Sequence, residues 1–175
     1  MTDKQYLVAY LDRYQKALAK ITEMEQIRQR IEASAVSPKG VNIDAVKVKS
    51  NKLSDRVSQP VVSAVSIGEK IEQLRSKLPA LAESTTRIIN KLPCDDYRGQ
   101  MLLELRFIFG YPLSTACSIL HVSRSQVYLL YGKALEALLN LQDVHEILER
   151  YKIRLKENKL RWQEKEHCSG KNPRE

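Results

Sequence analysis

Apolar residues recur every three or four positions along the first part of the chain, which is the spacing of one face of an α-helix. The pattern predicts a long amphipathic helix over residues 1–35, with charged side chains on its other face. So narrow a stripe needs a second helix to cover it, from the same chain or from another copy, in a helical hairpin or a coiled coil. The stripe consists of Leu7, Leu11, Tyr14, Leu18, Ile21, Met24, Ile27 and Ile31.

The helical pattern is lost over residues 36–66, where two prolines and a glycine interrupt it and five basic residues accompany two acidic ones. We interpret this segment as a flexible basic linker, with a phosphate-contacting arm as the alternative. Helical spacing returns in a second long helix over residues 67–92, which Pro79 should kink or divide in two. An antiparallel pairing of the two long helices would bury both apolar stripes.

Residues 93–141 carry the strongest local signal, a helix-turn-helix pattern. Two helices that cross steeply need a small residue at the crossing and a left-handed residue in the tight turn. Cys117, flanked by Ala116, supplies the small residue, and His121 stands in the turn, where histidine is tolerated better than most side chains. Ser123 follows as the N-cap of the second helix. The apolar residues expected to lock this corner are Ile119, Leu120, Val122, Val127, Leu130, Ala134, Leu135 and Leu138.

The second helix of the corner presents a polar face to the outside. Arg124 can pair with guanine through two hydrogen bonds, and Gln126 can do the same with adenine. Hydroxyl and ammonium groups on the same face are candidate phosphate contacts. The predicted DNA-binding set is therefore Ser123, Arg124, Ser125, Gln126, Tyr128 and Lys133.

The last part of the chain returns to a charged helical pattern. We expect a basic C-terminal helix over residues 142–166 and a disordered polar tail over 167–175. From Arg150 to Arg161 the helix holds six basic residues and one acidic residue. The expected fold is all-α: long N-terminal helices in a hairpin or coiled coil, a helix-turn-helix domain, and a charged C-terminal helix.

Charge changes this interpretation in one respect. The chain carries a formal net charge of +8, which favours polyanionic partners such as nucleic acid. The predicted DNA-reading segment 93–141 has no net charge, however, and Leu129 and Gly132 lie on its exposed face. Because affinity for DNA comes largely from neutralised phosphates, a neutral reader needs positive charge from elsewhere. The nearest source in the sequence is the basic run from Arg150 to Arg161.

Several kinds of site have no signal in the sequence. The three cysteines are far apart and show no metal-binding spacing, so we expect neither a metal site nor a disulfide framework. No Gly-rich phosphate loop or nucleophile–base constellation occurs, and we expect no cofactor and no enzymatic activity. The N-terminus lacks the apolar core of a signal peptide and no apolar run reaches membrane-spanning length. We therefore expect a cytoplasmic protein without a membrane partner.

Three short motifs carry a resemblance to a known family. They are the Leu-Arg-aromatic-Ile-x-Gly pattern at 105–110, Val-Ser-Arg-Ser-x-Val-Tyr at 122–128 and Ala-Leu-x-x-Leu at 134–138. Over residues 98–141 the chain resembles the C-terminal helix-turn-helix of the major bacterial sigma factors, and more closely phage late-transcription regulators of the ArpU/RinA type. The family commonly has glycine in place of His121 and arginines in place of Leu129 and Gly132.

The resemblance implies a phage or prophage protein in the cytoplasm of a bacterial host cell. It would activate late packaging and lysis genes through double-stranded DNA and host RNA polymerase. We expect a homo-oligomer, although the sequence leaves open whether the long helices pair within one chain or between chains.

Two other functions fit the same pattern. A phage small terminase subunit, which packages DNA, also combines a helix-turn-helix with oligomerising helices, usually with the DNA-binding part first. A protein-only interaction module would use the helical stripes to bind RNA polymerase or another factor without DNA. A large ring would favour packaging, and salt-sensitive retardation of DNA would exclude the protein-only module.

Overall fold

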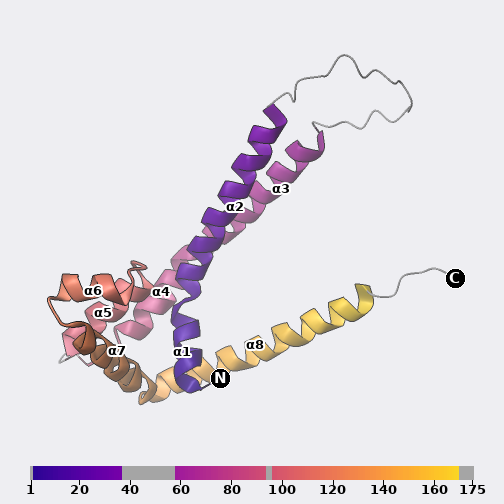
Figure 1. Ribbon diagram of the computed structural model, residues 1–175. Coiled ribbons are helices and arrows are strands. Elements are labelled where there is room, and N and C mark those ends of the chain that lie inside the picture. Colours follow the sequence, from indigo (N-terminus) through magenta and orange to yellow (C-terminus); the bar gives the residue numbers. More distant parts are fainter. Residues whose placement is uncertain (1, 37–57, 94–95, 170–175) are drawn as a thin grey trace, which may run out of the picture. The chain divides into compact units, whose positions relative to one another are not determined.

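In the computed structural model the described residues are 2–36, 58–93 and 96–169, and every regular element within them is a helix (Figure 1). The all-α expectation is thereby confirmed for this part of the chain. Most of the predicted linker, residues 37–57, and the end of the predicted tail, residues 170–175, lie outside the described residues. The chain forms two compact units, Met1–Gln15 with Ala82–Glu175, and Lys16–Leu81.

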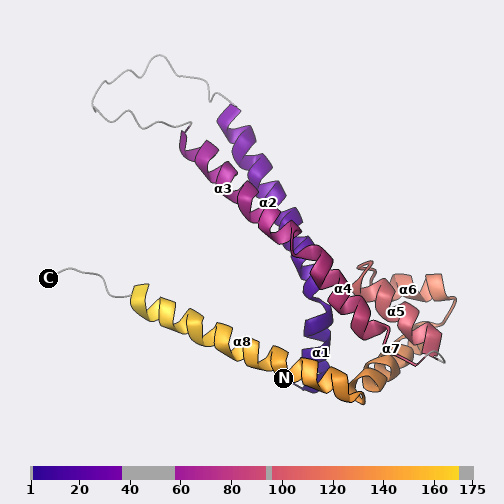
Figure 2. The ribbon, with the colours of Figure 1, turned by 180° about the vertical axis from the view of Figure 1, so that it is seen from behind.

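The first unit is built around α7. Helices α1, α5, α6 and α8 all contact α7, and α1 also contacts α8 (Figures 1 and 2). The core is a cluster of fully or almost fully buried side chains, each of which contributes about 1.5–3 kcal/mol when it leaves water. Its members include Leu7, Leu11, Ile88, Ile89, Leu103, Phe107, Leu135, Leu138, Val144 and Leu148. The helices are α1 (Asp3–Leu11), α5 (Tyr97–Phe107), α6 (Leu113–Leu120), α7 (Arg124–Leu139) and α8 (Gln142–Ser169), with the later part of α4 (Leu78–Ile89).

The predicted single helix over residues 1–35 is divided in two, so that part of the prediction is wrong. Helix α1 ends at Leu11, and α2 (Arg13–Val36) begins after Asp12. Asp12 keeps a right-handed backbone (φ −68°, ψ −9°) and its N–H still donates to the Val8 carbonyl, so the break is only one residue wide. Apolar spacing runs through it unchanged, which is why the sequence pattern did not reveal it.

The second unit contains most of α2 together with α3 (Ser58–Arg75), and both views show these helices side by side (Figures 1 and 2). Arg75 forms an ion pair of 2.5 Å with Glu25, and Gly68 lies beside the Arg28 guanidinium. The contacts move forward along α2 as they move back along α3, so the two helices run antiparallel. Buried side chains of the unit include Ile21, Ala64 and Ile71.

Helix α8 continues to Ser169, so the predicted tail does not begin at residue 167. Two boundaries of the second long helix also differ from the sequence expectation. Helix α3 begins at Ser58, inside the predicted linker, and its start is therefore earlier than the predicted residue 67. The predicted helix 67–92 is divided between Arg75 and Leu78, and Pro79 falls in the first turn of α4. Proline is tolerated there because the amide that it lacks would have no partner within the helix.

Candidate nucleic-acid interface

The turn between α6 and α7 uses the left-handed backbone conformation expected of His121, at φ 52° and ψ 44°. The N–H groups of His121 and Val122 both donate to the Cys117 carbonyl and so close the end of α6. A non-glycine residue in this conformation costs roughly 1–2 kcal/mol. The turn is therefore maintained by the packing on either side of it, and we call residues 113–139 the α6–α7 corner.

Packing at the corner centres on Ala116, which is completely buried together with Val127 of α7 and Leu102 of α5. Cys117, the predicted crossing residue, is only half-buried, and its Sγ donates to the Leu113 carbonyl at 3.2 Å. The residue at the crossing is thus the neighbouring alanine. The other partly buried members of this cluster are Met101, Leu113, Leu120, Val122, Leu130 and Tyr131.

Ile119 does not join the core, and its predicted burial is wrong: it is 38% exposed. Helix α6 directs Leu113, Ala116 and Leu120 toward its neighbours, a set with the i, i+3, i+7 spacing of one helical face. Ile119 falls outside that face. The predicted burial of Ala134, Leu135 and Leu138 in α7 is confirmed.

The start of α7 is a capping box. Ser123 Oγ accepts from the Gln126 backbone N–H at 3.3 Å, as predicted for an N-cap, and Gln126 Oε1 accepts from the Ser123 N–H at 2.9 Å. Ser125 Oγ lies 3.1 Å from Ser123 Oγ. The Ser-x-x-Gln spacing is the sequence signal for the second bond. Pairing of Gln126 with adenine requires its oxygen to release the Ser123 amide.

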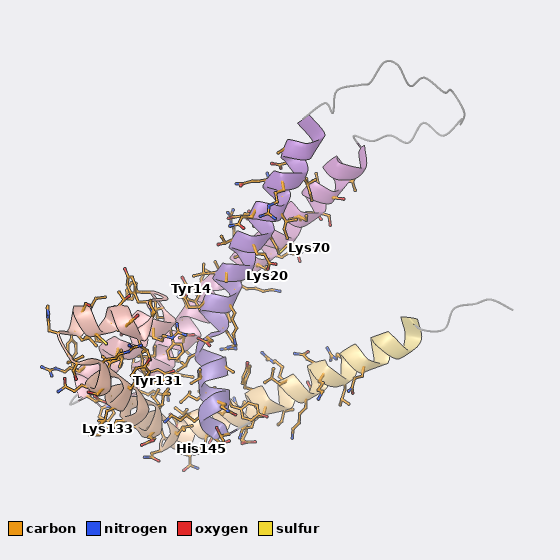
Figure 3. All side chains as sticks on the ribbon, in the orientation of Figure 1. Tyr14, Lys20, Lys70, Tyr131, Lys133 and His145 are labelled. Carbon is orange, nitrogen blue, oxygen red and sulfur yellow. The ribbon has the colours of Figure 1, made fainter. Side chains whose placement is uncertain are left out.

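All six predicted contact residues are exposed, in the first three turns of α7. A helical rotation of 100° per residue places Arg124 and Tyr128 along one edge of the exposed face, and Gln126 and Lys133 along the other. Lys133 is labelled in Figure 3. The centre of the face carries Ser125, Leu129, Gly132 and Glu136. Its two cations, Arg124 and Lys133, therefore lie at the edges.

Apart from the Ser125 hydroxyl, the middle of the face is apolar or acidic. Leu129 is 57% exposed, Gly132 is half-buried beside Lys4, and Lys4 lies 3.5 Å from Glu136. Behind it, Tyr131 stacks on Phe107 with ring centroids 6.3 Å apart, and burial raises the pKa of the Tyr131 phenol. The surface of α7 thus offers hydrogen-bonding and methyl-sized groups more than positive charge.

Positive charge gathers instead on the later part of α8, where every described side chain from Ile153 to Arg161 is exposed. The charge of Lys152 is already compensated by two carboxylates, because its Nζ lies 2.7 Å from Asp3 and 2.6 Å from Glu149. The hydrogen bonds to these carboxylates raise the pKa of its ammonium group. Four further cations on this helix form no ion pair with another described residue. They are Arg154, Lys156, Lys159 and Arg161.

The described ranges contain no group of three or more His, Cys, Asp or Glu side chains that could hold a metal ion. Nor does any helix in them combine the length and apolar character that crossing a membrane requires. The chain matches no protein-family model, no curated protein and no solved structure.

Proposed function

We propose that this protein is a sequence-specific DNA-binding transcription regulator that inserts the start of α7 into the major groove. The observation that carries the proposal is the α6–α7 corner. It combines a left-handed turn at His121, a capped start of α7 and exposed polar side chains in the first turns of that helix. The major groove is about 12 Å wide and admits a helix of that diameter. A helix-turn-helix of the sigma-factor type uses its second helix in this way.

Arg124 is the principal base reader in this proposal. Its guanidinium forms no ion pair or hydrogen bond with another residue that the structure describes, so it is free to donate twice to guanine. Leu129, at the centre of the exposed face, suits the methyl group of thymine. Gln126 is a second reader only when adenine replaces the Ser123 amide as the partner of its Oε1.

Phosphate contacts come from two places. On α7, Lys133, Tyr128 and Ser125 are exposed on the same face as the reading positions. Only Lys133 among them carries a charge that neutralises a phosphate, which is too little for firm binding. The exposed cations of α8 supply the rest.

The resemblance to phage late-transcription regulators supports a more specific role. We propose that the protein activates packaging and lysis genes together with host RNA polymerase, in the bacterial cytoplasm, as a homo-oligomer. Exposed apolar side chains on the second unit support assembly, because Val62 and Val65 of α3 are 67% and 58% exposed. Light scattering should give a mass of at least two chains, and a monomer at micromolar concentration would contradict the assembly.

Footprinting on DNA that flanks the protein's own gene tests the central proposal. A discrete protected site is expected, and Arg124→Ala should remove its preference over random DNA while leaving the weak binding to random DNA in place. Arg98→Ala is a matched control, because Arg98 is exposed on α5, outside the corner. Absence of any protected site, at salt concentrations where random DNA is bound, would contradict specific regulation.

A protein-only interaction module is the second candidate, and the exposed apolar side chains of the corner favour it. Tyr128, Leu129 and Ile119 are 53%, 57% and 38% exposed. A mobility shift across salt concentrations separates the two functions: retardation that falls steeply with salt indicates phosphate neutralisation. No retardation even at low salt would leave the protein-only module as the better proposal.

A further inference from the structure

A pocket of about 220 Å³ lies where α8 meets the end of α1 and the start of α2, entirely within the first unit. Three arginines line it, and no carboxylate is among its lining residues. Two tyrosines and an isoleucine form the remaining wall. The lining residues are Tyr10, Arg13, Ile147, Arg150, Tyr151 and Arg154.

Arg13 is held in place before any ligand arrives. Its Nε donates to the Tyr10 carbonyl at 2.9 Å and its Nη2 donates to Ser84 Oγ at 3.2 Å. Its guanidinium carbon lies 3.5 Å from the centre of the Tyr10 ring and 5.5 Å from that of Tyr151. Two of its five N–H groups are used by these bonds, which leaves donors for a bound anion. A side chain fixed in this way loses little conformational entropy on binding.

The tyrosines give the pocket a rigid, uncharged wall. Their rings stand almost perpendicular, at 86°, with centroids 5.2 Å apart, and the Tyr151 hydroxyl lies 3.5 Å from the Ala9 carbonyl. Burial raises the pKa of the Tyr151 phenol, while the Arg13 guanidinium acts in the opposite direction. Because the phenol is neutral near pH 7, it does not offset the arginines.

The other two arginines carry charge that is hardly compensated. Arg150 Nη2 lies 4.0 Å from Glu146, with both side chains well exposed, which makes a weak pair. Arg154 forms neither an ion pair nor a hydrogen bond with any residue in the described ranges. Three like charges around one concavity repel each other, and an anion that accepts several hydrogen bonds relieves that repulsion.

We propose that this pocket binds a phosphate group. Planar guanidiniums match the oxygens of phosphate with paired hydrogen bonds. Three guanidiniums offer more donors than the two oxygens of a carboxylate ligand can use, which favours phosphate. The phosphate has two conceivable sources, the backbone of nucleic acid and a free phosphorylated compound. The inference does not depend on base reading by α7, because its residues lie on α1, α2 and α8.

Titration calorimetry of the full-length protein with inorganic phosphate, at constant ionic strength set with chloride, tests the site. We expect saturable binding of phosphate that Arg154→Gln weakens by about tenfold, the equivalent of one charged hydrogen-bonding partner. Lys70→Gln removes the same charge from α3, an exposed position in the second unit and outside the pocket, and should leave the affinity unchanged. Equal phosphate affinity in the two variants, or no saturable binding to the unsubstituted protein, would overturn the proposal.

Arg13→Gln is the second variant, with circular dichroism to show that it folds. A weakening of phosphate binding beyond that of Lys70→Gln is expected, because the fixed guanidinium is lost. Should Arg13→Gln unfold, the Arg154→Gln result decides alone, since Arg154 is exposed and has no structural partner in the described part.

A competition arm identifies the source of the phosphate. When a 12-base-pair duplex displaces inorganic phosphate, and Arg154→Gln weakens both ligands, the site belongs to the nucleic-acid backbone. When the duplex leaves phosphate binding unchanged, the site takes a free phosphorylated compound, and 5′-AMP is the next probe. Either result supports the pocket, and neither depends on Arg124, so failure of base reading would be seen separately in the Arg124→Ala footprint.

Discussion

The exposed face of α7 and the later part of α8 are two helical surfaces of the same unit, and they differ in charge. On α7, the exposed positions from Arg124 to Glu136 carry two cations at the edges and one carboxylate near the centre. On α8, the run from Arg150 to Arg161 carries six basic residues and one acidic residue. The first surface is shaped for hydrogen bonds and methyl contacts, whereas the second is shaped for anions.

The difference shows how the two requirements of specific DNA binding can be met by separate parts of one unit. Discrimination between bases needs donors and acceptors in a fixed geometry, and charge adds nothing to it. Affinity needs neutralised phosphates, and the identity of the bases adds little to it. We therefore expect substitutions on α8 to change binding strength and substitutions on α7 to change sequence preference.

The largest expected effect is on affinity. Arg154→Gln, Lys156→Gln and Lys159→Gln together should weaken binding to all DNA sequences by roughly a hundredfold, about 1 kcal/mol for each lost phosphate contact. The slope of log affinity against log salt should fall by about three. Mobility shifts at several salt concentrations measure both. The matched control removes Lys20, Lys70 and Lys77 from the second unit in the same way. An equal loss of affinity in that control would show that the effect comes from the net charge of the protein and not from phosphate contacts on α8.

Base preference is the next effect in size. Arg124→Lys retains the positive charge but loses the paired donors, so discrimination at one base pair should fall by about 1–3 kcal/mol with an unchanged salt slope. Competition between duplexes that differ at single positions measures the discrimination. Intact discrimination in this variant would assign Arg124 to phosphate contact, a role that lysine also fills, and the contrast between α7 and α8 would disappear.

Removal of the N-cap should have a smaller effect, on stability. Ser123→Ala should lower the free energy of unfolding by about 1 kcal/mol, since the backbone N–H of Gln126 loses its acceptor. Urea denaturation measures the loss. Gln126→Glu should keep the capping box and the stability, because a carboxylate also accepts from the Ser123 amide.

The Gln126→Glu variant also tests the second function of that residue. Glutamate cannot donate to adenine, so a changed base preference in a fully stable variant would identify Gln126 as a reader. An unchanged preference would leave it as a cap alone.

The smallest effect is expected at the turn. His121→Gly should raise the free energy of unfolding by about 0.5–1 kcal/mol, because glycine adopts the left-handed conformation without the steric cost that histidine bears. His121→Ala retains that cost and should bring no gain. Thermal denaturation of the two variants compares them, and a loss of stability in His121→Gly would show that the imidazole makes a contact of its own.

Features that depend on neighbours in the chain could be predicted from the sequence. The left-handed His121, the N-cap at Ser123 and the buried face of α7 were predicted, because turn conformation, capping and helical periodicity act over a few residues. The all-helical class followed from the same periodicity. The exposure of the predicted DNA contacts is another consequence of that helical spacing.

What the sequence could not show depends on contacts between distant segments. Ile119 was expected in the core and Cys117 at the helix crossing because it is small, yet only the packing of α5 and α7 on α6 selects Ala116 for burial. The break at Asp12 leaves no trace in the apolar spacing. Arg13 meets Arg150 and Arg154 across more than 130 residues of chain, because α1 packs on α8. Local periodicity thus determined the helices and their buried faces, and tertiary packing decided which of their charges came together.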